Sequence, residues 1–98
     1  MTYNLIIAPD AVKDIEKAFD YYSRFSRTAI DTFDKELLQV FDILEKNPFF
    51  QVRYKKLRAV PFRSLPYLVF FELDDKDKAV YIYSVFNTFL NTDIYPNR

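Results

Sequence analysis

The chain contains no histidine, no cysteine and no glycine among its 98 residues. Without histidine it lacks the commonest general base and the commonest transition-metal ligand of proteins. Without cysteine it has neither disulfides nor a thiolate nucleophile, and without glycine it has no glycine-rich phosphate loop. Ser-His-Asp catalysis is therefore excluded within the chain. Because no spacing of carboxylates indicates a site for a hard cation either, we expect no metal site and no cofactor.

Long apolar runs are also absent. No stretch approaches the roughly 18 apolar residues that a membrane-spanning helix needs, and the N-terminal segment lacks the basic region that begins a signal peptide. We therefore expect a cytoplasmic protein with no membrane partner. Half of the residues are hydrophobic and 19% are aromatic, which suits a small domain that fills its core with large rings. We expect residues 1–98 to form a single domain.

Two segments show the apolar spacing of amphipathic helices. Pro9 suits the first turn of a helix, and apolar residues then recur at steps of three and four. The pattern breaks at residues 23–27 and restarts at Thr28, which with Asp31 resembles a capping box. A second apolar stripe follows and ends before Pro48, which cannot continue a helix. We expect these two helices to pack as an antiparallel hairpin.

The remaining segments have the spacing of strands. Residues 3–8 are rich in β-branched residues, and residues 52–58 alternate as one strand with a rather polar face. Residues 67–73 are nearly all apolar, which is typical of a central strand, and residues 79–86 form the last strand. The order strand, helix, helix, strand, strand, strand (βααβββ) predicts a two-layer α+β domain. In it, the helical hairpin packs on a small, mainly antiparallel sheet.

A concentration of positive charge lies between Gln51 and Phe71, where the chain has five basic residues and no acidic one. These five residues are Arg53, Lys55, Lys56, Arg58 and Arg63. Such a surface can bind phosphate groups or an acidic partner. The alternative is a solvated strand face whose long side chains cover apolar surface. In one continuous strand, Arg53 and Lys55 would point to one face and Lys56 and Arg58 to the other.

Two charged residues have competing interpretations. Arg63 precedes the central strand, where its guanidinium can hold a carboxylate or a phosphate at two points. It can equally form a structural ion pair with a helix carboxylate such as Asp14 or Asp20. Glu72 lies in the apolar central strand and can act as a general base if burial raises its pKa. Its alternative is an ion pair with Lys55 or Arg58 on the adjacent strand.

Three uncharged residues are further candidates for binding. Tyr83 can stack on a nucleic-acid base, or it can simply pack against a neighbouring strand. Tyr95 lies in the C-terminal tail, from which it can reach a ligand. Asn87 can orient a phosphate or a water molecule, or it can end a strand without any chemical role.

Several segments resemble one protein family. Residues 8–15 (APDAVKDI) resemble its entry to the first helix, and residues 63–71 (RSLPYLVFF) resemble its Arg-x-Phe-Pro-Tyr-x-Ile-x-Tyr stretch. Residues 85–88 (VFNT) resemble its Val-Phe-His-Thr strand end, and residues 91–96 its trailing segment. With the βααβββ order, these segments give a resemblance over essentially the whole chain. The family is the RelE/ParE toxin superfamily of bacterial type II toxin–antitoxin modules, and the closest branch is the ParE-like, plasmid-stabilisation branch.

The resemblance implies a growth-inhibiting toxin that a cognate antitoxin neutralises and that acts on DNA gyrase or on translation. One alternative is a ribosome-dependent mRNA interferase, an endoribonuclease; another is a catalytically inactive protein-binding module of the same fold. A homodimer is allowed when the antitoxin is absent. The basic stretch, Tyr83 and Tyr95 would then contact nucleic acid or a partner protein.

If the chain is an enzyme, the catalytic candidates are Arg63, Lys55 and Asn87. Asn87 stands where many members of the superfamily have histidine, and Leu68 where RNA-cleaving members often have arginine. These departures favour the gyrase-inhibiting branch over the RNA-cleaving one.

Overall fold

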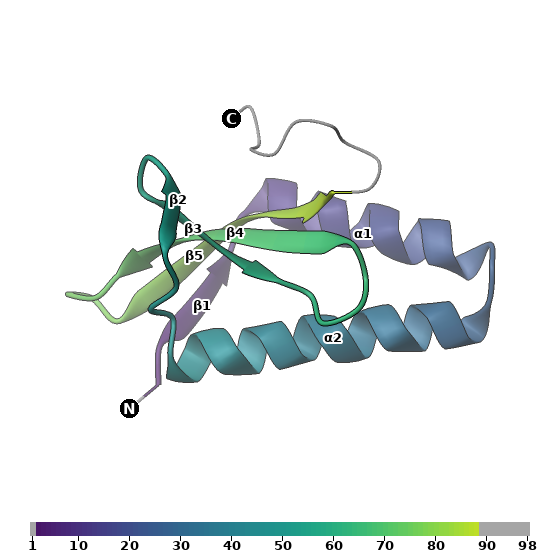
Figure 1. Ribbon diagram of the computed structural model, residues 1–98, viewed down its shortest axis with the longest axis horizontal. Helices are drawn as coiled ribbons and strands as arrows, with labels where there is room; N and C mark the ends of the chain where they lie inside the picture. The colour runs from purple at the N-terminus through teal and green to yellow at the C-terminus, as the bar shows by residue number, and fades with distance from the viewer. Residues whose placement is uncertain (1, 89–98) are drawn as a thin grey trace.

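The structure, a computed structural model, describes residues 2–88 of the chain. Its elements are β1 (Asn4–Ile7), α1 (Pro9–Ser23), α2 (Arg27–Lys46), β2 (Val52–Tyr54), β3 (Leu57–Pro61), β4 (Tyr67–Asp74) and β5 (Ala79–Asn87). The two helices lie beside one five-stranded sheet, so the predicted two-layer α+β class is confirmed (Figure 1). Neither helix within residues 2–88 is long and apolar enough to cross a membrane.

The sheet has the strand order β1-β5-β4-β3-β2. In the described part of the chain, β1 runs parallel to its neighbour and the other three strand pairs are antiparallel. β4 lies at the centre, as its apolar sequence predicts, and Val69 and Phe71 within it are fully buried. β1 ends at Ile7, whereas β5 continues to Asn87. The last part of β5 therefore has α1, not another strand, on that side.

Residues 52–58 are not one strand, as the alternation predicted, but the start of a hairpin. Tyr54 at the end of β2 pairs with Leu57 at the start of β3, and Lys55 and Lys56 lie between them. Lys55 has a φ of 53°, in the left-handed region that glycine or asparagine usually supplies in such a turn. Because the chain has no glycine and lysines occupy this turn, the sequence lacks the residues that usually indicate a hairpin turn. The order of elements is therefore βααββββ.

α2 begins with a different cap from the one predicted. The Ser26 hydroxyl accepts a hydrogen bond from the Ala29 N–H at 3.1 Å. Thr28 lies inside the first turn, where its carbonyl accepts a hydrogen bond from the Thr32 hydroxyl at 2.9 Å. The break between the helices is thus shorter than residues 23–27. Because serine and threonine both cap helices well, the sequence does not decide between the two positions.

An aromatic cluster joins the helical hairpin to the sheet. Phe33 of α2 is fully buried, and its ring centroid lies 5.3 Å from that of Phe19 in α1. The Phe33 ring is also 5.2 Å from that of Tyr67 in β4 and 5.3 Å from that of Phe62 in the preceding loop. Aromatic pairs of this kind contribute about 0.5–1.5 kcal/mol each beyond the area that they bury. Phe33 thus connects both helices to the end of the sheet at which β4 begins.

Replacing Phe33 by Ala removes the ring at the centre of this cluster. We expect the free energy of unfolding, measured by urea denaturation, to fall by about 3–5 kcal/mol. The control is Leu38→Ala on the same helix. Leu38 is 57% exposed, so its truncation should change the free energy by less than about 0.5 kcal/mol. Similar losses for the two variants would contradict the central place of Phe33 in the core.

Candidate functional site

The turn of the β2–β3 hairpin forms one end of a candidate site. Lys55 and Lys56 line a cavity of about 660 Å³ together with Glu72 of β4 and Tyr83 of β5. Residues 8–10, at the junction of β1 and α1, form part of the same wall. Figure 1 shows the hairpin standing out from the sheet on the side away from α2. The fold thus brings three of the predicted residues, Lys55, Lys56 and Tyr83, to one cavity.

The polar groups of this cavity are the two lysines, the carboxylates of Asp10 and Glu72, and tyrosine hydroxyls that include that of Tyr83. The Tyr83 hydroxyl donates a hydrogen bond to Glu72 Oε1 at 3.5 Å. Burial and the charge of Glu72 raise the pKa of Tyr83 above its usual value, so the phenol stays protonated at neutral pH. The ion pair considered between Glu72 and Lys55 or Arg58 is not found among the described residues. The lysines therefore remain available to an anionic ligand.

The other basic residues of the hairpin do not line this cavity. Arg58 is half-buried, and its Nη1 donates a hydrogen bond to the Phe50 carbonyl at 2.6 Å. This side chain holds the segment that leads into β2. Arg53 is exposed on β2. Because Lys55 and Lys56 form a turn, the prediction that alternation sorts the four basic residues onto two faces of one strand is wrong.

Arg63 and Asn87 lie at the opposite end of β4. Arg63 is exposed in the loop between β3 and β4, and Asn87 pairs with Tyr67, the first residue of β4. Lys55 lies near Glu72, toward the other end of the same strand. Five residues of extended chain separate Tyr67 from Glu72 by roughly 17 Å. The three catalytic candidates, Lys55, Arg63 and Asn87, therefore do not share one site.

Tyr67 and Asn87, at the end of β4 near Arg63, are poorly suited to proton transfer at neutral pH. Burial and the neighbouring Tyr22 raise the pKa of the Tyr67 hydroxyl well above its usual value, and Asn87 opposes this only in part. Tyr67 is therefore a neutral phenol, and an asparagine amide neither takes nor gives a proton under these conditions. These two residues can offer hydrogen bonds beside the charge of Arg63, but no proton transfer at neutral pH.

Sequence reasoning missed Glu36, which holds the loop that carries Arg63. Glu36 Oε1 accepts hydrogen bonds from the Ser64 N–H at 2.9 Å and the Leu65 N–H at 3.1 Å, and Oε2 accepts one from the Ser64 hydroxyl. Burial alone would raise the pKa of Glu36, but these hydrogen bonds and one from the backbone of Arg63 lower it below the usual value. The signal in the sequence was an acid three residues after Phe33, next to the apolar stripe.

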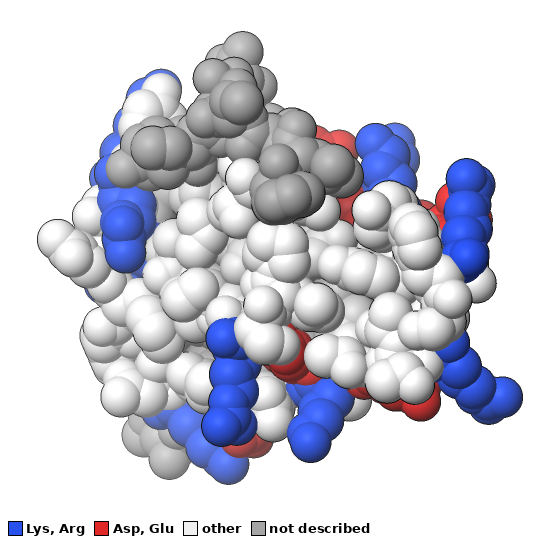
Figure 2. Space-filling model, turned by 45° about the vertical axis from the view of Figure 1, so that its right-hand side comes forward, with Lys and Arg blue, Asp and Glu red and all other residues white. Residues whose placement is uncertain are grey.

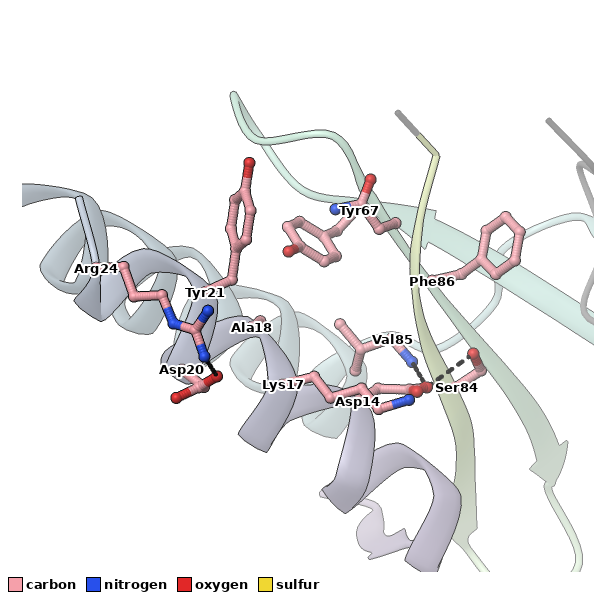
Figure 3. Close-up of a pocket in the computed structure, with 11 residues that line it drawn as sticks. Asp14, Lys17, Ala18, Asp20, Tyr21, Arg24, Tyr67, Ser84, Val85 and Phe86 are labelled. Atoms are coloured by element: carbon pink, nitrogen blue, oxygen red, sulfur yellow. Dashed lines mark hydrogen bonds and ion pairs between the residues drawn. The ribbon is translucent and has the colours of Figure 1, made fainter. Parts of the chain in front are cut away.

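A second cavity, of about 440 Å³, lies between α1 and the end of β5 (Figure 3). Asp14 of α1 points toward β5, where its Oδ2 accepts hydrogen bonds from the Ser84 hydroxyl at 3.1 Å and the Val85 N–H at 3.0 Å. β1 ends before this part of β5. Asp14 thus takes the place that a carbonyl of a neighbouring strand would occupy.

One further expectation can be compared with the structure. Among the described residues, Arg63 forms no ion pair with Asp14 or Asp20, and Asp20 pairs with Arg24 at 2.9 Å. The structural ion pair considered for Arg63 is therefore not found in the part of the chain that the structure describes. Tyr95 and the segment 91–96 lie outside the described residues.

Residues 5–88 match the family described as the ParE toxin of the type II toxin–antitoxin system parDE. Because the match extends over most of the chain, the chain belongs to this family. The predicted membership of the RelE/ParE superfamily, in its ParE-like branch, is thereby confirmed, and the protein is a toxin of the type II toxin–antitoxin class. No curated protein sequence matches the chain.

Solved structures of the superfamily share the fold. The chromosomal ParDE system from P. aeruginosa has a TM-score of 0.72 at 14% identity, over 87% of this chain and 95% of that chain. The RelBE2 complex from Mycobacterium tuberculosis has a TM-score of 0.60 at 16% identity, over 89% and 99% of the two chains. The intact E. coli RelBE complex has a TM-score of 0.53 at 20% identity, over 85% and 93%. At these identities the likeness concerns the fold alone.

Replacing Asp14 by Ala should loosen the end of β5 from α1. Two donors, the Ser84 hydroxyl and the Val85 N–H, lose their acceptor, so we expect a loss of about 1–3 kcal/mol in the free energy of unfolding. The control is Glu16→Ala, an exposed acid on the same helix, which removes the same charge. If the two variants are equally stable in urea denaturation, the contact with β5 does not contribute as described.

The contribution of Glu36 to stability should depend on pH. Its pKa is lowered in the folded chain, so the stabilisation is complete above the unfolded pKa of about 4.3 and is lost as pH falls through the folded value. The difference in free energy of unfolding between the wild-type chain and Glu36→Gln should therefore stay constant near neutral pH and shrink below about pH 4. Urea denaturation over a pH series measures it. A difference that grows with acidification would contradict the assignment.

Proposed function

We propose that this toxin arrests bacterial growth by binding its target and not by cleaving RNA, and that the target is DNA gyrase. The observation that carries the proposal is the separation of the catalytic candidates. Lys55 lies at one end of β4, and Arg63 and Asn87 lie at the other. General acid–base catalysis needs its groups within hydrogen-bonding reach of the same reacting atoms.

The chemistry of the side chains supports the same proposal. The chain has no histidine, and the raised pKa values of Tyr67 and Tyr83 keep both phenols protonated at neutral pH. Two separated sets of positive charge suit a large protein surface better than one scissile phosphate. Contact at both ends of β4 would let the toxin hold a partner along the length of this strand.

A cognate antitoxin is the second partner that we propose. The ParDE and RelBE structures that share this fold are toxin–antitoxin systems. On the helical hairpin, Tyr21, Phe25 and Leu38 are 42%, 66% and 57% exposed. Figure 2 shows a face on which uncharged side chains fill the centre and most charged side chains stand toward the margin. Exposed apolar side chains of this kind suit a protein partner, and without the antitoxin a second copy of the toxin can cover them.

Cleavage of mRNA on the ribosome is the alternative, and one observation favours it. Lys55, Lys56 and Tyr83 line one cavity, in which a base could stack on the ring while the lysines neutralise phosphates. Catalysis there would depend on electrostatic stabilisation and on the 2′-hydroxyl of the RNA itself.

Controlled expression in bacteria without an antitoxin distinguishes these functions. We expect growth arrest with altered plasmid supercoiling or DNA breaks, and no new mRNA 5′ ends by primer extension. Lys55→Ala with Lys56→Ala should weaken the arrest, whereas Lys76→Ala, which removes a charge from the turn between β4 and β5, serves as a control. New mRNA ends would establish the interferase, and normal growth at clear soluble expression would leave only the inactive binding module.

A further inference from the structure

The loop of residues 62–66 is held more firmly than a simple connection requires. At its start, the Phe62 N–H donates a hydrogen bond to the Tyr67 carbonyl at 2.9 Å, and the Tyr67 N–H donates one to the Leu65 carbonyl at 2.8 Å. At its end, the Pro66 carbonyl accepts a hydrogen bond from the Thr88 N–H at 2.8 Å. The loop is thus fixed both to β4 and to the residue that follows β5.

Glu36 adds a third attachment, from α2. Glu36 is 6% exposed, and its carboxylate accepts hydrogen bonds from Ser64 and Leu65. Burying a carboxylate is costly unless hydrogen bonds satisfy it. Helix packing alone would be served by an apolar residue here, because Phe33, Leu37 and Val40 around it are all buried. The carboxylate is therefore explained by the loop that it holds, and not by the core.

Arg63 is the side chain that this loop presents to solvent. It is exposed, and among the described residues it forms no ion pair. A guanidinium on a backbone already fixed in place loses less freedom when it binds, which increases affinity. Arg63 also stands apart from the lysines of the hairpin, at the other end of β4. A nucleic-acid backbone is bound by several cations together, whereas a single guanidinium can hold one carboxylate at two points.

We propose that Glu36 is a positioning residue: by holding the backbone of Ser64 and Leu65, it fixes Arg63 where it binds an acidic side chain of the protein target. This inference rests on the proposed function, since it takes Arg63 to contact the target. Glu36 itself touches no ligand. Its effect on activity therefore passes through Arg63, which separates it from a residue that only stabilises the fold.

A double-mutant cycle of growth arrest tests the coupling. Wild type, Glu36→Gln, Arg63→Ala and the double variant are expressed without antitoxin over a graded induction series. Losing a charged hydrogen-bond partner should weaken the arrest by about tenfold or more in Glu36→Gln. Because the effect passes through Arg63, the double variant should be no weaker than Arg63→Ala alone. The matched control is Glu45→Gln, an exposed acid on α2, which should leave the arrest unchanged.

The rigidity of the loop is measured separately, by backbone ¹⁵N relaxation of the purified proteins. In the wild-type chain the N–H groups of residues 63–65 should have order parameters near 0.85, and in Glu36→Gln they should fall toward 0.6, both being approximate values for rigid and flexible backbone. Ser64→Ala removes only the hydroxyl donor and should show a smaller change in the same direction. It also keeps the inference testable if Glu36→Gln does not fold.

The outcomes are distinct. If the wild-type chain causes no growth arrest, that result contradicts both the proposed function and the contact of Arg63 with a target, whatever the relaxation data show. If arrest is lost in Arg63→Ala but kept in Glu36→Gln, or if the two effects add in the double variant, only the positioning role is overturned. Fluorescence anisotropy with a labelled duplex DNA tests the class of ligand. If the protein binds the DNA and Arg63→Ala abolishes this binding, Arg63 binds a phosphate and not a carboxylate.

Discussion

The packing of Phe33 against rings from α1, β4 and the loop before β4 is the contact on which the rest of the structure depends. A chain of 98 residues forms only a small hydrophobic core. One buried ring shared by both helices and the sheet therefore sets where the helical hairpin lies. Once α2 is fixed by Phe33, Glu36, one turn later on the same helix, lies under the loop that carries Arg63. The same helix, α2, thus supplies both the central ring of the core and the carboxylate that holds the loop with Arg63.

Each helix also sends one carboxylate to the sheet. Asp14 of α1 binds the end of β5 beyond β1, and Glu36 of α2 binds the loop before β4. Both carboxylates accept hydrogen bonds from backbone N–H groups that have no strand partner at that point. Side chains therefore complete the hydrogen bonding of the sheet at the end where β4 begins. The opposite end carries the lysine turn of the β2–β3 hairpin. Positive charge is thus presented at both ends of β4, by Arg63 on the loop that Glu36 holds and by the lysine turn, which suits contact with an extended partner surface.

Much of this architecture could be predicted from the sequence, because the apolar periods of the two helices and of β4 and β5 are strong and uninterrupted. The β2–β3 hairpin could not, because its turn is made of Lys55 and Lys56 in a chain without glycine, and the alternation passes through it. The error affected the predicted site, because the basic residues do not form one surface. Lys55 and Lys56 form a turn, Arg58 is half-buried, and Arg63 lies at the other end of β4. Glu36 was missed for a different reason. A glutamate on a helix is usually solvated, and only tertiary structure shows which backbone groups surround it.

The central claim is that this member of the ParE toxin family acts by binding and not by cleavage. The charge distribution, the absence of histidine and the separation of Lys55 from Arg63 along β4 all support binding over cleavage. The most direct measurement is the supercoiling of relaxed plasmid by purified DNA gyrase in the presence of the purified protein. The account predicts inhibition that increases with toxin concentration and weakens when Arg63 is replaced by Ala. Unchanged supercoiling, together with cleavage of mRNA in a purified translation reaction, would contradict it.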